Sequence, residues 1–159
     1  MRAAVLTISD GVSEGTREDR SGDVLEELLA AEGYEVERRV VPDDRDAIAD
    51  AIAELAGEAR LVLTTGGTGL GPRDVTPEAT MMVLERAAPG IAEAIRADSI
   101  ARTPHALLSR GVAGAVGETL VVNLPGSPGG CRDGFAVVRP ALGHALELLA
   151  GEQGAHRQT

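Results

Sequence analysis

The residue types that could do chemistry are concentrated in a few short segments, and a glycine-rich one is the sharpest. Thr65–Pro72 contains four glycines in eight residues. Glycine tolerates positive φ angles and lets the backbone approach a ligand, so successive N–H groups can form a nest for an anion. The hydroxyl groups of Thr65, Thr68 and Thr76 add donors nearby. This pattern predicts a phosphate-binding loop, and the alternative is a flexible connection whose glycines only form turns.

Charged side chains follow the glycine-rich segment and also follow a second predicted strand. Arg73 has a planar fork of donors that can clamp a phosphate, and Asp74 can hold Mg²⁺ against phosphate oxygens. The alternative for these two residues is a surface ion pair with an acid beside a helix start. Asp43 and Asp44 could likewise either bind Mg²⁺ or have a structural role beside a helix start. Asp44 is the expected helix cap.

Other reactive groups are too scattered for most familiar chemistries. All fifteen cations are arginine, so a Walker A lysine and a Schiff base are excluded. Cys131 is the single cysteine and the three histidines do not cluster, which argues against a zinc site. Ser109 and Cys131 have no recognisable base partner, so a hydrolase triad is unsupported. Leu124–Gly130 (LPGSPGG) presents Ser127 ahead of a helix, with a simple turn as the alternative.

Composition limits the partners. The 159 residues carry a net charge of −10 and only 1% aromatic residues, which disfavours binding to nucleic acid or to an anionic membrane. No apolar run reaches the length of a membrane span, and no signal-peptide pattern begins the chain. We therefore expect a cytoplasmic protein with a single domain over residues 1–150 and a frayed tail over 151–159.

Alternating apolar runs and amphipathic stretches must position these loops. Strands are predicted over Ala3–Ile8, Tyr34–Val41 and Leu61–Thr64, and a hairpin over Val112–Val116 and Thr119–Asn123. Helices are predicted from a Ser21 cap to Glu32, from Asp44 to Ala56, from a Thr76 cap onward, from Pro89 toward Ser99 and over Cys131–Ala150, kinked or split at Pro140. This order predicts a three-layer α/β/α sandwich with a mostly parallel central sheet. In such sheets ligands bind at the carboxyl ends of the strands, where the unusual loops lie.

Four separated motifs together resemble one family. The segment Leu63–Thr80 (LTTGGTGLGPRDVTPEAT) looks like the signature of the Mog/MoaB proteins of molybdenum cofactor biosynthesis, which are similar to the N-terminal domain of gephyrin. Leu6–Asp10 (LTISD), Val40–Asp43 (VVPD) and Asn123–Pro128 (NLPGSP) resemble the other family motifs, in family order. Gly129 stands where a lysine is common in the family.

The resemblance implies a function. The family activity is Mg²⁺-dependent transfer of AMP from ATP to the terminal phosphate of molybdopterin, which releases pyrophosphate. Family members usually form homotrimers, and a molybdate-insertion protein acts downstream of them. A second hypothesis is a non-catalytic molybdopterin-binding or carrier protein of the same family, and a third is an unrelated α/β scaffold. Nucleotidyl transfer needs positioning and charge neutralisation more than a protein nucleophile, which agrees with the missing triad.

Motif matching transfers the family roles to individual positions. Asp43 and Asp74 are the implied catalytic residues and candidate Mg²⁺ ligands. The implied substrate-binding residues form three groups: the first loop (Ser9, Asp10, Gly15, Asp19, Ser21, Gly22) near the nucleotide, the glycine-rich segment (Thr65, Gly66, Gly67, Thr68, Gly69, Arg73, Thr76), and the last loop (Pro125, Gly126, Ser127). The last two groups fall on the surface that binds the pterin and its phosphate.

Overall fold

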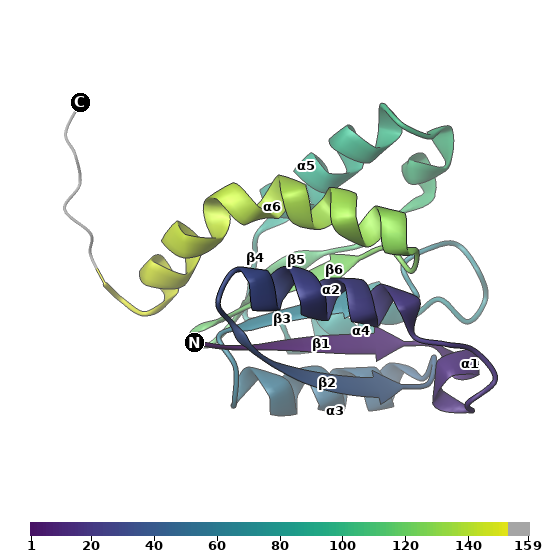
Figure 1. Ribbon diagram of the computed structural model, residues 1–159, viewed down its shortest axis with the longest axis horizontal. Helices are drawn as coiled ribbons and strands as arrows, with labels where there is room; N and C mark the ends of the chain where they lie inside the picture. Colours follow the sequence, from purple (N-terminus) through teal and green to yellow (C-terminus); the bar gives the residue numbers. More distant parts are fainter. Residues whose placement is uncertain (153–159) are drawn as a thin grey trace.

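The computed structural model describes residues 1–152, which form one six-stranded sheet with helices on both faces (Figure 1). The strands are β1 (Arg2–Ile8), β2 (Glu35–Val41), β3 (Leu61–Thr65), β4 (Arg86–Ala87), β5 (Ala113–Val116) and β6 (Thr119–Leu124). The helices are α1 (Asp10–Ser13), α2 (Arg20–Ala31), α3 (Arg45–Ala56), α4 (Thr76–Val83), α5 (Pro89–Ile100), the 3-10 helix η1 (Pro104–Leu108) and α6 (Pro128–Leu149). Residues 153–159, most of the tail predicted to fray, lie outside the described residues.

The strand order in the sheet is β2-β1-β3-β6-β5-β4. The first four strands of this order run parallel, and β5 and β4 pair antiparallel at one edge. β5 and β6 form the hairpin that the sequence predicts around Gly117. The predicted three-layer α/β/α sandwich with a mostly parallel sheet is therefore confirmed.

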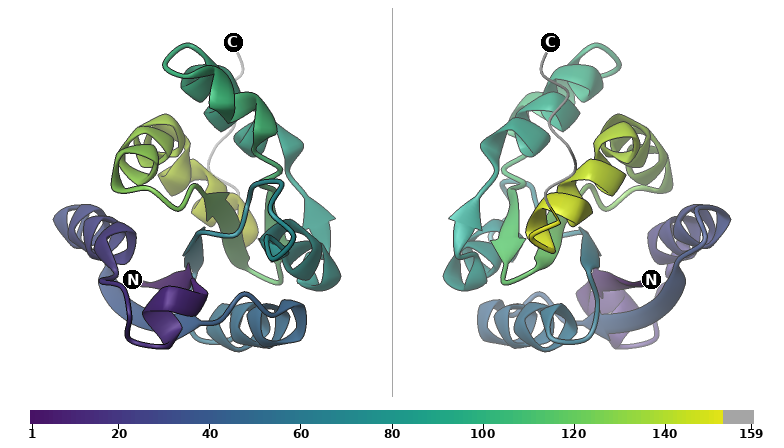
Figure 2. Two further views of the ribbon diagram at one scale, coloured as in Figure 1. Left: turned by 90° about the vertical axis from the view of Figure 1, so that its right-hand side faces the viewer. Right: turned by 90° about the vertical axis from the view of Figure 1, so that its left-hand side faces the viewer.

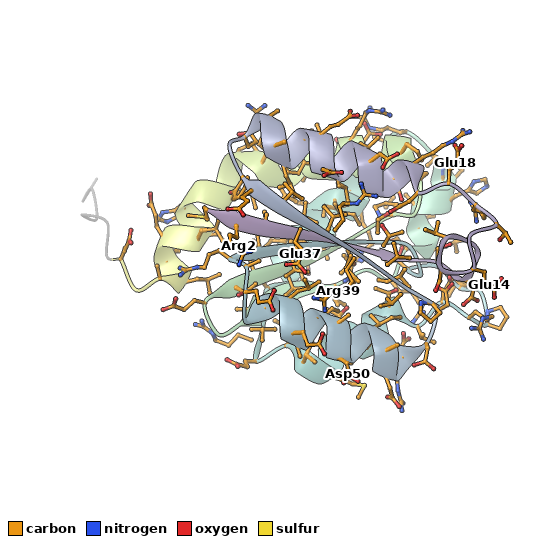
Figure 3. The ribbon with its side chains drawn as sticks, turned by 60° about the horizontal axis from the view of Figure 1, so that its bottom comes forward. Arg2, Glu14, Glu18, Glu37, Arg39 and Asp50 are labelled. Atoms are coloured by element: carbon orange, nitrogen blue, oxygen red, sulfur yellow. The ribbon has the colours of Figure 1, made fainter. Side chains whose placement is uncertain are left out.

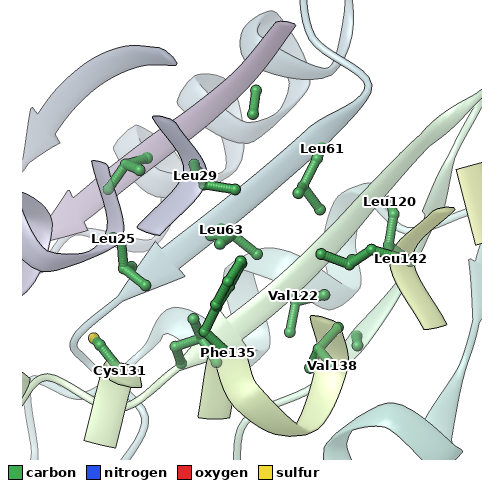
Figure 4. Close-up of a cluster of buried hydrophobic side chains, with 14 of the residues drawn as sticks. Leu25, Leu29, Leu61, Leu63, Leu120, Val122, Cys131, Phe135, Val138 and Leu142 are labelled. Carbon is green, nitrogen blue, oxygen red and sulfur yellow. The ribbon is translucent and has the colours of Figure 1, made fainter. Parts of the chain in front are cut away.

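The central strands β1, β3 and β6 are buried on both faces, which explains why they are largely apolar runs. Successive side chains alternate between the faces, so Val5, Leu63 and Val122 pack beneath α2 and α6, whereas Leu6 packs against α3 on the other face. Figure 2 shows the helices on the two sides of the sheet, and Figure 4 shows Phe135 of α6 beside Leu63 and Val122. These two clusters fix the strand ends from which the loops emerge.

The topology determines where a ligand can bind. From β1 the chain passes through α2 to β2 on one side, and then through α3 to β3 on the other side of β1. In doubly wound sheets of this kind, ligands bind outside the carboxyl ends of the strands, where the strand order reverses. The segments after β1, β2, β3 and β6 all leave the sheet at this edge, and they contain the loops that the sequence singles out.

Two helix starts differ from the sequence prediction. α2 is capped by Asp19, whose carboxylate accepts an N–H of the first turn, and not by Ser21. α4 has no side-chain cap, because the hydroxyl group of Thr76 donates to the carbonyl oxygen of Gly66 instead. Asp44 caps α3 as predicted. At Thr76, a contact with another part of the chain decides the role of the side chain.

One helix begins earlier than the sequence predicted, and three elements are too short for a sequence pattern to reveal. α6 begins at Pro128, capped by Ser127, and continues as one helix through Pro140. The sequence did not indicate α1, β4 or η1, which are too short to show a hydrophobic period. Within residues 1–152, no helix has the length and apolar character needed to cross a membrane.

The edge strand β2 carries charged pairs on both of its faces. Arg39 pairs with Glu37 and with Glu54 of α3 on the face shown in Figure 3. Arg38, on the opposite face, pairs with Asp19 as well as with two further acids of α2. Charged side chains at a sheet edge discourage pairing with a strand of a second chain, so they protect β2 from such pairing. Arg38 also holds the first loop in place through Asp19.

Candidate functional site

A cavity of about 650 Å³ lies at the carboxyl ends of β1 and β3, where the strand order reverses. We call it the first cavity. Its lining includes these residues singled out from the sequence: Ser9, Asp19, Ser21, Asp43, Thr65, Gly66, Gly67, Asp74 and Gly126. The fold thus brings parts of four distant loops to one place, and the binding roles of these residues remain predictions.

The backbone of the glycine-rich segment has a conformation that requires glycine. Gly66 and Gly67 have φ angles of +100° and +71°. A Cβ atom on Gly66 would lie 2.3 Å from the carbonyl oxygen of Ile8, and one on Gly67 would lie 2.3 Å from the Oγ1 of Thr76. Glycine at these two positions is therefore needed for both backbone angle and space.

Threonine hydroxyl groups near this segment bind the protein itself. The Oγ1 of Thr76 donates to the carbonyl oxygen of Gly66 at 2.9 Å. The Oγ1 of Thr65 donates to the carbonyl oxygen of Pro125 at 2.7 Å, which ties the glycine-rich segment to the last loop. Both threonines are fully buried. Both hydroxyl groups therefore support the loop in this structure, and their predicted contacts with a ligand remain predictions.

Asp10 and Asp43 hold each other in place through their backbones. The N–H of Asp10 donates to the Oδ2 of Asp43 at 2.9 Å, and the N–H of Asp43 donates to the Oδ1 of Asp10 at 3.0 Å. Arg73 donates to the Oδ2 of Asp10 at 2.6 Å and to the carbonyl oxygen of Asp43 at 3.2 Å. The guanidinium group expected to clamp a phosphate therefore joins three loops of the protein in this structure.

The two carboxyl groups titrate differently because their surroundings differ. The hydrogen bond from Arg73 lowers the pKa of Asp10 below its ordinary value. Burial raises the pKa of Asp43, and the negative charges of Asp10 and Asp74 add to this rise. Asp43 is thus a carboxylate whose charge is poorly stabilised by the protein, as expected of a group that binds a cation.

Replacing Asp43 by asparagine is expected to raise the Tm at neutral pH. With a raised pKa, the folded wild type holds the Asp43 proton more tightly than the unfolded chain, so its stability falls as pH rises above about 3.8 and through the folded pKa. Asparagine does not titrate and escapes this loss. The rise in Tm should be small, because Asp43 is only partly buried and water screens its charge.

Thermal melts of both proteins from acidic to neutral pH test this expectation. The Tm difference between Asp43→Asn and the wild type should be small in acid, widen as pH rises, and then level off. A difference that stays the same at every pH would mean that burial of the Asp43 charge is not its cause.

Asp74 lines the first cavity together with Asp43. Its Oδ2 accepts the N–H of Gly71 at 2.9 Å, which closes a small turn in the loop and leaves its other oxygen without a hydrogen bond from this turn. Mg²⁺ commonly binds one or two carboxylates together with substrate phosphates. These two acids fit such a site, and the residues described contain no cluster of three or more acidic, histidine or cysteine ligands.

The first loop contributes both support and charge. Asp19 accepts the hydroxyl of Thr7 at 2.7 Å, the N–H of Gly22 at 3.0 Å and the guanidinium of Arg38 at 2.5 Å. A Cβ atom on Gly22 would lie 2.3 Å from the Oδ2 of Asp19, so glycine permits this close packing. Asp19 is thus largely committed to holding the start of α2.

Several residues that the sequence analysis left out also line the first cavity. Its wall includes Arg17 and Glu18 of the loop before α2, Arg20 at the start of α2, Val12 of α1 and Pro128 of α6. Glu18 is one of the side chains labelled at this end of the molecule in Figure 3. Nothing in the sequence indicated that the two arginines line the same cavity as the glycine-rich segment.

A second cavity of about 320 Å³ lies beside the same two loops. Thr68, Gly69, Pro125 and Ser127, all singled out from the sequence, line it together with residues of α5, η1 and the start of α6. Its other lining residues include Arg96, Arg102 and His105. The glycine-rich segment therefore contributes to both cavities, with Gly66 and Gly67 in the first and Thr68 and Gly69 in the second.

Five of the sequence-derived candidates line neither cavity: Asp10, Gly15, Gly22, Arg73 and Thr76. Four of them support lining residues through the contacts described above. Gly15 has a φ of +77° and forms a turn after α1. The structure thus divides the candidates into residues at a cavity surface and residues that hold those in position.

Doubly wound α/β domains bind ligands at the carboxyl edge of the sheet, and this chain places its glycine-rich loop and two carboxylates at that edge. Comparison with known proteins identifies the family. A family model described as a probable molybdopterin binding domain matches residues 4–144, and the chain belongs to this family.

The relatives are proteins of molybdenum cofactor biosynthesis. The molybdopterin adenylyltransferase of Helicobacter pylori J99 is 39% identical over 152 residues, covering 92% of this chain and 86% of that protein. The molybdenum cofactor synthesis protein cinnamon of Drosophila melanogaster is 40% identical, and the chain spans 26% of its length. The structure of the molybdopterin biosynthesis enzyme MoaB from Thermus thermophilus matches with a TM-score of 0.88 and 46% identity, over 94% of this chain and 96% of that chain. The resemblance drawn from the four motifs is confirmed.

Proposed function

We propose that this protein transfers AMP from ATP to the terminal phosphate of molybdopterin, with Mg²⁺, and releases pyrophosphate. The observation that carries the proposal is the pair of carboxylates, Asp43 and Asp74, lining one cavity beside the close-approach backbone of Gly66 and Gly67. The adenylyltransferase relatives support it, because they match nearly the whole of this chain.

The reaction needs no nucleophile from the protein. An oxygen of the pterin phosphate attacks the α-phosphorus of ATP, and the bond from that phosphorus to the bridging oxygen of the β-phosphate breaks. The pyrophosphate takes the electron pair of that bond as it leaves. Asp43 and Asp74 would hold the Mg²⁺, which neutralises charge on the phosphates. The backbone of the glycine-rich segment and the arginines at the cavity would orient them.

The two cavities suit two substrates. We assign the nucleotide to the first cavity, which the first loop lines, and the pterin to the second, which contains Pro125 and Ser127. The reacting phosphates would then meet at the glycine-rich segment, which contributes to both. Both substrates are anionic and the chain has a net charge of −10, so arginines at each cavity, Arg17 and Arg96 among them, have a clear electrostatic purpose.

A carrier that binds molybdopterin without transferring AMP is the second candidate. It is favoured by one contact, the hydrogen bond from Gly71 to Asp74, which gives this acid a structural use. Incubation of the pure protein with ATP, Mg²⁺ and molybdopterin separates the two functions. The enzyme releases pyrophosphate and needs Mg²⁺ to do so, whereas a carrier binds the pterin and leaves ATP intact.

Homotrimer assembly and a cytoplasmic location stay predictions, as does a downstream molybdate-insertion partner. The β5–β6 hairpin offers little apolar surface for assembly, because Val121 and Val122 are fully buried within the chain. Exposed apolar side chains lie elsewhere, on Met81 and Met82 of α4 and on Leu107 of η1. Light scattering should give a mass near three times 16.4 kDa, and a monomer mass at micromolar concentration would contradict the trimer.

A further inference from the structure

The loop that carries Asp74 is held from outside by Arg110, a residue distant from it in the sequence. The Nε of Arg110 donates to the carbonyl oxygen of Gly69 at 2.8 Å, and its Nη2 donates to the carbonyl oxygen of Asp74, also at 2.8 Å. Its Nη1 pairs with Glu78 in the first turn of α4. The backbone N–H of Arg110 adds a bond to the carbonyl oxygen of Thr68 at 2.8 Å. One residue therefore holds both ends of the loop.

The chemistry of these contacts requires arginine. The guanidinium group presents its N–H donors in a rigid planar fork, so three of its nitrogens reach three acceptors at fixed relative positions. Glu78 neutralises and orients the guanidinium group, and the pairing with Arg110 lowers the pKa of Glu78. A lysine ammonium is a single compact donor on a flexible stem and does not reproduce this arrangement.

Without Arg110 the middle of this loop has few attachments to the body of the protein. The Asp74 carboxylate and the Asp74 N–H both bond to Gly71, which lies in the same loop. Leu70 at the tip is 65% exposed. The remaining ties described above run through Thr76 at the end of the loop and through Arg73 to Asp10. Arg110 is thus the contact that fixes the Asp74 backbone directly.

We propose that Arg110 is a positioning residue for AMP transfer, acting through Asp74 and the rim of the second cavity. The inference rests on the proposed function of the site. Because Thr68 and Gly69 line the second cavity and Asp74 lines the first, one guanidinium group sets the distance between the two substrate positions. The side chain of Arg110 is 33% exposed, so water can replace its lost bonds, and its removal should affect loop position more than stability.

Arg110→Met, Arg110→Lys and a matched control test the proposal. The control is Arg60→Met, since the Arg60 side chain is 32% exposed and likewise pairs with one glutamate, Glu118, away from both cavities. Arg110→Met should lower kcat by about tenfold to a hundredfold, with a much smaller change in KM for ATP, because small displacements of catalytic groups cost this much. Arg110→Lys should recover little of the loss, and the control should retain the wild-type rate.

A double substitution shows whether Arg110 acts through Asp74. In an Asp74→Asn background, Arg110→Met should add little further loss, whereas two independent contributions would multiply. Hydrogen exchange gives a readout that does not depend on turnover. The amides of Gly71 and Asp74 should exchange faster in Arg110→Met, while amides of the buried strand β1 should be unchanged.

These outcomes separate the inference from the function on which it rests. If the wild type transfers no AMP, the proposed function is overturned. Faster hydrogen exchange of the loop amides in Arg110→Met would still support the inference that Arg110 fixes the position of the loop. Normal turnover and normal loop exchange in Arg110→Met overturn the inference. So does a rate loss accompanied by faster exchange in β1, because that would indicate a general structural role.

Discussion

Replacing Asp74 by asparagine is expected to lower AMP transfer by about a hundredfold or more, the scale of a single electrostatic group in a transition state. The amide keeps an oxygen that can accept the N–H of Gly71, so the turn in the loop should survive. The charge that would hold Mg²⁺ against the phosphates is lost. We therefore expect a fall in kcat with nearly unchanged molybdopterin affinity and Tm.

Asp44, which follows Asp43 in the sequence, offers a matched control for this variant. Asp44 is exposed and caps α3, with its Oδ1 accepting the N–H of Ala47 at 2.8 Å, and it does not line the first cavity. Asparagine caps helices as well as aspartate does, so Asp44→Asn removes one negative charge near the site without removing the cap. Turnover of Asp74→Asn close to that of Asp44→Asn would end the metal-carboxylate mechanism and favour the carrier.

The parts of this fold that the sequence predicted are those determined by local pattern. Continuous apolar runs predicted the buried strands, and Asp44 followed by a periodic segment predicted the start of α3. Four glycines in eight residues predicted a loop with unusual backbone angles, which Gly66 and Gly67 have. Each of these signals is contained in fewer than about fifteen residues, which is the range that periodicity and capping rules cover.

The roles that the sequence did not predict depend on partners far along the chain. Arg73 looked like a free phosphate clamp because Asp10, its partner, lies 63 positions away. Thr76 looked like a helix cap because its acceptor, the carbonyl of Gly66, becomes visible only once the loop has folded back. Arg110 had no motif around it and lies 36 positions from Asp74. Side-chain types alone could not separate residues that line a cavity from residues that support them.

Gly67→Val is the second variant for which we expect a large effect, because it combines backbone strain with a steric clash at the site. A valine at a φ of +71° is strained, and its Cβ would lie 2.3 Å from the Oγ1 of buried Thr76 and 3.3 Å from the Oδ1 of Asp43. Strain and overpacking each cost about 1 to 3 kcal/mol. We expect molybdopterin and ATP binding to be lost and the Tm to fall by roughly 5 to 15 °C.

The control for this variant separates the effect of backbone strain from the effect of the steric clash. Gly117, in the β5–β6 turn, also has a positive φ, +56°, but a Cβ there would meet nothing within 4 Å. Gly117→Val should therefore lose stability through strain alone and should retain ligand binding, since its turn lies outside both cavities. Titration of both variants below their melting temperatures separates binding from folding. If Gly67→Val bound both substrates as tightly as Gly117→Val, the glycine-rich segment would be a connector, and the phosphates would have to bind elsewhere at the carboxyl edge of the sheet.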